Sequence, residues 1–225
     1  MNTAIIVAAG SGQRFAGTQP KQFVNLLGKP LIIHTLERFM SCPAIDEIVL
    51  ALSDEGREHF EQIRGEFEIS KLRSIITGGK TRAESVRNGL DAIDKSVADV
   101  VAVHDGARAL VSVDDITRTV EKAAETGAAC LVAEVTDTIK EIENDFISRT
   151  VDRSRLRRAL TPQAFHYDIL RRAFEGVDLS ESITDECYLV EKLGVKIALV
   201  EGSSRNIKIT RAEDLTLAEA FLKGS

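Results

Sequence analysis

The chain has 225 residues, of which 44% are hydrophobic and 28% charged, and its formal net charge is −6. This composition is typical of a soluble globular protein with a real core, and the negative charge argues against nonspecific nucleic-acid binding. No apolar run is long enough to span a bilayer and no basic-then-apolar segment opens the chain, so we expect a cytoplasmic protein without a membrane partner.

Apolar, strand-like runs alternate with helical patterns along most of the chain. Strands are expected near Ala4–Ala8, Glu47–Leu52, Ser74–Thr77, Val100–His104, Ala129–Glu134 and Lys196–Val200. Helices are expected over Leu31–Met40, Glu55–Arg64, Arg82–Ile93 and Asp115–Thr126. The runs of Val, Ile, Ala and Leu indicate strands buried on both faces. The pattern predicts an α/β fold: a mainly parallel, twisted, Rossmann-like sheet flanked by helices, with ligands at the carboxyl ends of the strands.

The loop after the first strand has the features of a polyphosphate site. It consists of Ala8, Ala9, Gly10, Ser11, Gly12, Gln13 and Arg14, and Lys21 follows shortly after. Two glycines let backbone N–H groups approach a ligand, and the two cations add charge. The loop lacks the G-x-x-x-x-G-K-S/T pattern of NTPases. It also lacks the third glycine of the dinucleotide fingerprint, which would fall at Phe15, and this argues against an NAD(P)-dependent oxidoreductase. The alternative is a strand-to-helix turn with solvated cations.

Two further loops follow predicted strands. Gly79, Lys80 and Ser85 lie in the segment GGKTRAES, which suits the edge of a nucleobase or, alternatively, a glycine turn with a helix cap. Asp105 stands at the tip of a buried strand, where a carboxylate suits Mg²⁺. The alternative is that Asp105 caps the next turn and pairs with Arg108. We expect His104 to be structural.

The segment Thr136–Val151 departs from the alternation of strands and helices. It alternates polar and apolar residues around Glu143-Asn144-Asp145, which predicts an inserted β-hairpin. An isolated hairpin is marginal in water, so it must pack on a second subunit or on its own domain.

The remaining signals lie mostly near the C-terminus. Asn206–Thr210 alternates like a strand, and Lys208 on an inward face would need an anion as partner. Thr184-Asp185 predicts the cap of a helix that runs through Leu193.

The three cysteines are widely spaced and odd in number, which indicates packed hydrophobic residues rather than zinc ligands or disulfides.

Taken together, these segments resemble the 2-C-methyl-D-erythritol 4-phosphate cytidylyltransferases of the non-mevalonate isoprenoid pathway. The matching pieces, in the family's order, are AAGSGQRF with PKQF, GGKTRAES, VHDGAR, TDTIK, TVDR, ALTPQAF, TDE and NIKIT with EDL. The resemblance implies one nucleotidyltransferase domain over residues 1–225, with a dimerisation arm at about 136–152 and a homodimer. It also implies CTP and a polyol phosphate as ligands, with Mg²⁺ as cofactor. The implied products are 4-diphosphocytidyl-2-C-methyl-D-erythritol and pyrophosphate.

The resemblance also assigns roles by position. Arg14, Lys21 and Lys208 would be catalytic cations. The nucleotide would contact Ala8, Ala9, Gly10, Ser11, Gly12, Gly79, Lys80, Ser85, Asp105 and Gly106. Asp105 would lie near the metal and ribose. The sugar phosphate would contact Asp105, Arg108, Thr138, Arg153, Thr184 and Lys208, with Thr138 and Arg153 from the partner's arm.

Three positions depart from the family's usual pattern: Lys80, Gly106 and Ala109. The last two predict a less rigid loop around Asp105. A ribitol 5-phosphate cytidylyltransferase shares the glycine loop and the TPQ segment and is the nearest alternative. A nucleotide-binding module without catalysis is another.

Overall fold

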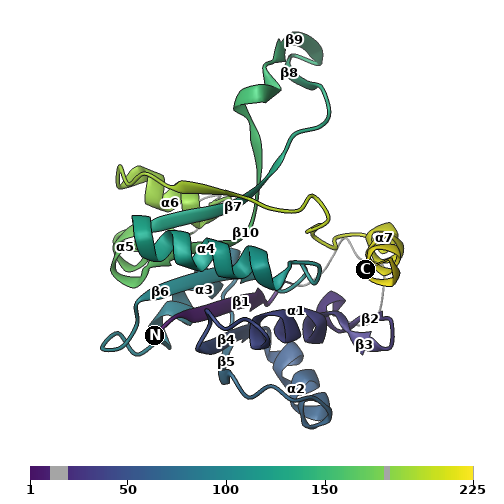
Figure 1. The fold of residues 1–225 in the computed structure, drawn as a ribbon, viewed down its shortest axis with the longest axis vertical. Helices are drawn as coiled ribbons and strands as arrows, with labels where there is room; N and C mark the ends of the chain where they lie inside the picture. Colours follow the sequence, from purple (N-terminus) through teal and green to yellow (C-terminus); the bar gives the residue numbers. More distant parts are fainter. Residues whose placement is uncertain (11–19, 180–182, 225) are drawn as a thin grey trace.

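Parallel strands joined by helices form the centre of the molecule (Figure 1). This computed structural model describes residues 1–10, 20–179 and 183–224. The strands are β1 (Thr3–Ala8), β2 (Asn25–Leu26), β3 (Lys29–Pro30), β4 (Glu47–Leu52), β5 (Leu72–Thr77), β6 (Val100–Asp105), β7 (Ala128–Glu134), β8 (Ile139–Glu143), β9 (Phe146–Val151), β10 (Arg157–His166) and β11 (Ala198–Glu201). The α-helices are α1 (Leu31–Met40), α2 (Asp54–Ile63), α3 (Arg82–Asp91), α4 (Val113–Thr126), α5 (Tyr167–Ala173), α6 (Glu186–Lys192) and α7 (Ala212–Lys223). Within these residues, no helix is long and apolar enough to cross a bilayer.

The central sheet confirms the predicted α/β class. In the described part of the chain it has seven strands in the order β11-β7-β10-β6-β1-β4-β5. The pairs β1–β4, β1–β6, β4–β5 and β7–β11 are parallel, and β10 alone runs antiparallel to its neighbours. The chain extends the sheet from β1 through β4 to β5 and then returns to the other side of β1. The crevice between β1 and β6 is therefore the switch point at which such sheets bind ligands.

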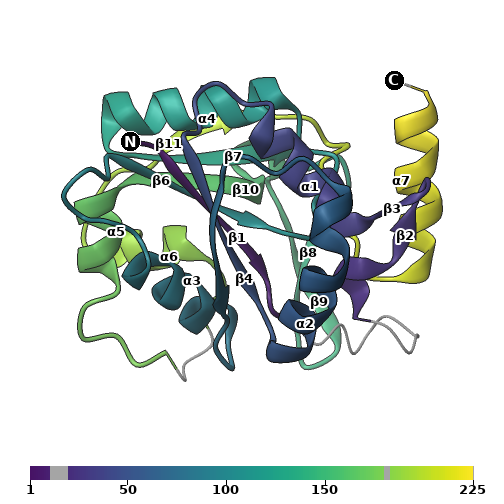
Figure 2. The same cartoon turned by 90° about the horizontal axis from the view of Figure 1, so that it is seen from below.

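Alternate residues of the buried strands supply two cores. In β1, Ala4 and Ile6 belong to the core shared with α1 and α4, whereas Ile5 belongs to the core shared with α3 and α5. Figure 2 shows α1 and α4 on one face of the sheet and α3, α5 and α6 on the other. The side-chain period of two in a strand explains why continuous apolar runs are needed here.

Strand β10 is the longest strand of the sheet, and the sequence analysis missed it, as it missed the helices α5 and α7. Its register on β7 shifts between Ala159 and Gln163, and this irregular stretch contains Thr161 and Pro162. Proline cannot donate to a strand ladder and is tolerated at such irregularities. Because Pro162 interrupts the strand pattern, the sequence does not predict a strand there.

The inserted hairpin is present and projects from the body of the molecule (Figure 1). β8 and β9 pair antiparallel, and Glu143 lies opposite Phe146 across a two-residue loop. The loop residues Asn144 and Asp145 both have positive φ, 49° and 66°, as hairpin turns of this length require. The turn predicted at these residues is confirmed.

The strand predicted over residues 206–210 is wrong. These residues form an irregular connection outside any ladder, and Asn206 and Ile209 are both buried, which breaks the expected alternation. Ile209 instead packs with residues of α7, β2 and the loop after β6 in a separate apolar cluster.

The cap predicted at Asp185 is confirmed, since its side chain accepts from the N–H of Tyr188 at the start of α6. All three cysteines are buried and unbridged, as expected.

Candidate active site

A cavity of about 600 Å³ opens at the carboxyl ends of β1 and β6. It brings together predicted site residues from five separate parts of the sequence. Those that line it are Ala8, Ala9, Gly10, Lys21, Gly79, Lys80, Ser85, Asp105 and Lys208. Further lining residues that sequence analysis had not singled out are Val7, Gln22, Thr81, Arg82, Ala107 and Thr210.

Other predicted residues do not line this cavity. Arg108 and Gly106 lie beside Asp105, and Thr184 is exposed just before α6. Thr138 and Arg153 are exposed at the base of the hairpin, where Arg153 donates to the carbonyl of Thr136. Ser11, Gly12 and Arg14 lie outside the described residues.

The glycine pair after β5 forms one wall of the cavity. A Cβ at Gly78 would lie 2.3 Å from Cβ of Ala9, and one at Gly79 would lie 2.2 Å from Cβ of Glu84. Only glycine allows this close approach of backbone. Thr81 caps α3 by accepting from the N–H of Glu84, so a helix cap does follow the glycine turn.

Ser85 holds this wall from inside the helix. Its Oγ accepts from the N–H of Gly79 at 3.0 Å and donates to the carbonyl of Thr81 at 3.0 Å. The side chain of Ser85 is buried and lines the cavity. The loop and the start of α3 are therefore one preformed unit.

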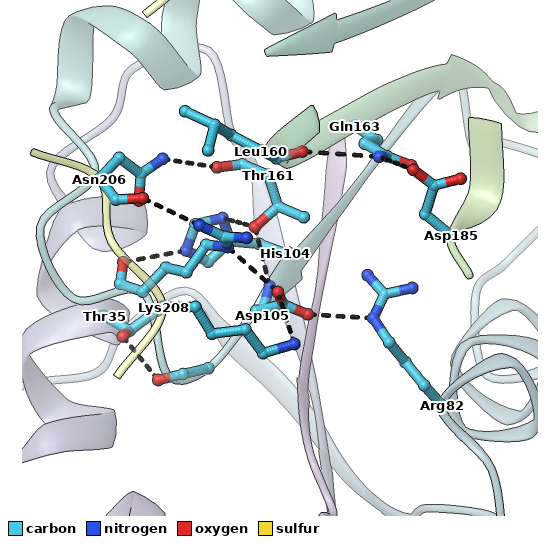
Figure 3. A network of polar contacts seen from close by, with 12 residues as sticks. Thr35, Arg82, His104, Asp105, Leu160, Thr161, Gln163, Asp185, Asn206 and Lys208 are labelled. Carbon is cyan, nitrogen blue, oxygen red and sulfur yellow. Dashed lines mark hydrogen bonds and ion pairs between the residues drawn. The ribbon is translucent and has the colours of Figure 1, made fainter. Parts of the chain in front are cut away.

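Three cations share the carboxylate of Asp105 (Figure 3). Arg82 Nε lies 3.0 Å from Oδ1, while Arg108 Nε and Lys208 Nζ lie 3.1 Å and 3.0 Å from Oδ2. Burial acts to raise the pKa of Asp105, but Arg82, Lys208 and Arg108 together hold it well below its usual range. Asp105 is thus a permanently charged centre that gathers cations at the cavity.

Arg82 is the main site residue that sequence analysis missed. It stands at the start of α3 and donates through Nη1 to Oε1 of Glu186 at 2.6 Å, in addition to Asp105. Burial acts to lower its pKa, yet Glu186 and Asp105 raise it further above its ordinary value. Its position in a helix start gave no signal, because its two partners are 23 and 104 residues away.

His104 has the structural role that we expected. Its Nδ1 meets Thr161 Oγ1 at 3.0 Å, and its Nε2 meets the carbonyl of Arg108 at 3.2 Å. Since the carbonyl of Arg108 can only accept, Nε2 carries the proton of the neutral ring, and Nδ1 accepts from the hydroxyl of Thr161. Burial lowers the pKa of His104 to about 3, so the ring is neutral.

The loop after Asp105 is packed tightly, contrary to the expectation of a less rigid loop. Gly106 donates to the carbonyl of Val7 at 2.9 Å, and its own carbonyl accepts from Thr35 Oγ1 at 2.9 Å. A Cβ on Gly106 would lie 2.8 Å from Cβ of Ala8, so glycine lets β6 approach β1 closely. Ala109 is fully buried.

The carboxylate of Asp105 does not fit a metal ion in this arrangement. Both of its oxygens already accept from cationic side chains, which would repel Mg²⁺. Among the described residues, no group of three or more His, Cys, Asp or Glu side chains gathers as a metal site. The role of Asp105 as a metal ligand stays a prediction that this charge arrangement disfavours.

Comparison with known proteins identifies the family. The model of the family described as "IspD: 2-C-methyl-D-erythritol 4-phosphate cytidylyltransferase" matches residues 2–224. A protein of that name from Bacillus velezensis is 43% identical over 97% of this chain and 94% of its own length. One from Syntrophus aciditrophicus is 40% identical over 98% and 95%.

Solved structures agree with the sequence relatives. The 4-diphosphocytidyl-2C-methyl-D-erythritol synthase of Anaerococcus prevotii superposes with a TM-score of 0.86 at 29% identity, covering 99% of this chain and 96% of its own. The Thermus thermophilus 2-C-methyl-D-erythritol 4-phosphate cytidylyltransferase gives 0.76 at 33% identity, covering 99% and 100%. With the fold and the cation-rich cavity described above, these matches show that the chain belongs to the 2-C-methyl-D-erythritol 4-phosphate cytidylyltransferase family.

Proposed function

We propose that this chain transfers the cytidylyl group of CTP to 2-C-methyl-D-erythritol 4-phosphate. The products are 4-diphosphocytidyl-2-C-methyl-D-erythritol and pyrophosphate. The observation that carries the proposal is the convergence of Lys21, Arg82 and Lys208 on one cavity in a chain of net charge −6. An acidic protein that gathers its cations at a strand-end cavity is built for a polyanionic ligand.

The reaction asks for charge stabilisation rather than a proton acceptor. The nucleophile is an oxygen of a phosphate monoester, which is already ionised at neutral pH. It forms a bond to the α-phosphorus of CTP while the bond from that phosphorus to the β-phosphate oxygen breaks. His104, neutral and buried behind Asp105, has no part as a base in this scheme. Catalysis then rests on positioning and on electrostatic stabilisation.

Each wall of the cavity has a role in this scheme. The backbone of Ala8–Gly10 and the side chain of Lys21 bind the triphosphate. The family resemblance assigns a further cation to Arg14, which lies outside the described residues. Gly79 and Ser85 border the cytosine. Lys208 faces the α-phosphate, where negative charge develops. Mg²⁺ remains a proposal for the nucleotide-bound enzyme, where it would supply positive charge to the phosphates; Asp105, as arranged here, would not hold it.

The hairpin supports a homodimer as part of the proposal. Its residues Ile142, Phe146 and Ile147 are 67%, 77% and 66% exposed. They are exposed because the hairpin projects from its own domain and packs little against it. Apolar side chains on a projecting hairpin suit a second copy of the chain. Thr138 and Arg153 at its base would then serve the partner's cavity.

A pyrophosphate-release assay tests the proposed function. The purified chain is given each nucleoside triphosphate with 2-C-methyl-D-erythritol 4-phosphate or ribitol 5-phosphate. We expect release only with CTP and the erythritol phosphate. Release mainly with ribitol 5-phosphate would contradict the choice of acceptor. CTP binding without release with either acceptor would favour a non-catalytic module.

A further inference from the structure

The three cations on Asp105 are not held equally. Arg82 has Glu186 as a second partner, and Arg108 donates through Nη1 to the carbonyl of Asn206 at 2.9 Å. Lys208 has Asp105 as its one partner among the described residues. Its side chain is 39% exposed, against 23% for Arg82 and 13% for Arg108. Lys208 is therefore the cation that can leave the carboxylate most readily.

Glu186 is a buried anchor for Arg82. Its side chain is fully buried at the first residue of α6, and Arg82 is its cationic partner in the described structure. The start of α6 is fixed on β10, because Gln163 donates to Asp185 at 2.9 Å and accepts from the N–H of Cys187 at 3.1 Å. A buried carboxylate is costly without a cation, so the Glu186–Arg82 pair holds the guanidinium in one place.

We propose that Arg82, anchored by Glu186, is a positioning residue that keeps Asp105 neutralised so that Lys208 can move to a phosphate group of the substrate. The proposal rests on the proposed function, in which Lys208 meets the α-phosphate.

The physical argument is an exchange of anions. If Lys208 were the sole partner of the buried Asp105, its departure would leave an uncompensated charge and would be strongly opposed. With Arg82 on Oδ1 and Arg108 on Oδ2, the carboxylate keeps two cations when Lys208 leaves. Lys208 then leaves a carboxylate oxygen of Asp105 and pairs with a phosphate oxygen of the substrate. Without Arg82, Asp105 would compete with the phosphate for the lysine.

A double-mutant cycle tests whether Arg82 acts through Lys208. The variants are Arg82→Gln, Lys208→Ala and the two combined, with kcat/KM for pyrophosphate release as readout. Arg82→Gln should lower kcat/KM at least about 10-fold in the wild-type background and less than about 3-fold in the Lys208→Ala background, since coupled residues are not additive. The same factor in both backgrounds would overturn the proposal, because a general loss of structure acts independently of Lys208.

Chemical labelling tests the same point without any activity. Acylation of Lys208 by an amine reagent is followed by peptide mass spectrometry and referred to Lys223, an exposed lysine paired with Glu219. In Arg82→Gln, Lys208 should label several-fold more slowly than in the wild type, because Asp105 holds it more tightly. Unchanged or faster labelling would contradict the proposal. If the wild type released no pyrophosphate, the proposed function would fail. The labelling rates would still show whether Arg82 controls how tightly Asp105 holds Lys208.

Variants of the anchor complete the experiment. Glu186→Gln keeps an oxygen that can accept from Arg82 and should retain activity within about 3-fold, whereas Glu186→Ala should resemble Arg82→Gln. Asp91→Asn, which breaks the exposed pair between Arg171 and Asp91, is the matched control and should leave activity unchanged. Thermal unfolding identifies any variant that misfolds, and Arg82→Met, which also removes the charge, then replaces Arg82→Gln. Full activity of Glu186→Ala would overturn the anchoring role.

Discussion

His104 and Asp105 are neighbours at the end of the same buried strand, yet His104 is neutral and Asp105 is charged. Asp105 stays charged because three cations compensate its burial. Among the described residues, His104 pairs with no carboxylate; it is held by a hydroxyl and a carbonyl and stays neutral. Both residues are fixed through Thr161, whose hydroxyl links the N–H of Asp105 to Nδ1 of His104. The neutral ring thus supports the charged carboxylate without adding a fourth cation.

This arrangement predicts a pH-dependent contribution of His104 to stability. In the unfolded chain the imidazole takes up a proton near its ordinary pKa of 6.5, whereas burial keeps the folded pKa at about 3. Between these values the unfolded state binds more protons, so stability falls as pH falls, by about 1.4 kcal/mol per pH unit at most. Urea unfolding of the wild type and of His104→Gln between pH 7 and pH 4.5 checks this. The wild type should lose stability more steeply, and parallel curves would contradict the buried neutral ring.

At the scale of elements, the wall formed by Gly78, Gly79 and the start of α3 is the part of the site most dependent on close packing. The capping box of Thr81 and Glu84 fixes the helix start, and the Glu84 carboxylate also accepts from the N–H of Lys80 at 2.5 Å. Local hydrogen bonds thus determine where the helix begins and where the loop backbone faces the cavity.

Gly79→Ala is expected to disturb this wall. The added Cβ would meet the Cβ of Glu84, which cannot rotate away, so the loop or the helix start must shift. We expect a loss of about 1–3 kcal/mol in unfolding free energy and a several-fold rise in KM for CTP. Gly65→Ala is the matched control, because no atom lies within 4 Å of its added Cβ. If both variants behaved alike in unfolding and CTP kinetics, the close approach at Gly79 would have no consequence.

The sequence predicted those elements whose signals are local. Strands β1, β4 and β6 are apolar runs, and the hairpin has its turn residues in place, so their positions followed from periodicity and turn chemistry. Strand β10 was missed because Pro162 interrupts the pattern. The site was predictable where loops follow strands, as at Gly79 and Asp105. Arg82 was not, because its importance comes from Asp105 and Glu186, which only the tertiary fold brings to it.

At the scale of the whole molecule, the projecting hairpin separates two groups of predicted site residues. Lys21 and Lys208 line the cavity of the body, whereas Thr138 and Arg153 lie at the base of the hairpin and do not line it. A second copy of the chain would reconcile the two groups if each hairpin reached the other copy's cavity. The apolar tip gives such a dimer a surface to bury.

Subunit mixing tests this arrangement directly. Lys21→Ala should lose about a hundredfold in turnover, the cost of one missing charge contact of about 3 kcal/mol. Arg153→Ala should mainly raise KM for the sugar phosphate. A mixed dimer has one cavity with Lys21 from one chain and Arg153 from the other, so that cavity is intact. At a sugar-phosphate concentration well below the raised KM, where Arg153→Ala alone is nearly inactive, random pairing of equal amounts would restore about a quarter of wild-type turnover, since half of the dimers are mixed and each has one working site.

Two controls make the mixing result decisive. Phe146→Asp, placed in both chains, should weaken the dimer in sedimentation and abolish the gain on mixing, because it puts a charge into the apolar tip. Differently tagged chains, coexpressed and purified through both tags, should recover about half of wild-type turnover per dimer, as one of two sites is intact. Activity no greater than the sum of the separate variants would mean that each cavity works with its own chain's Arg153, and the arm would then need another role.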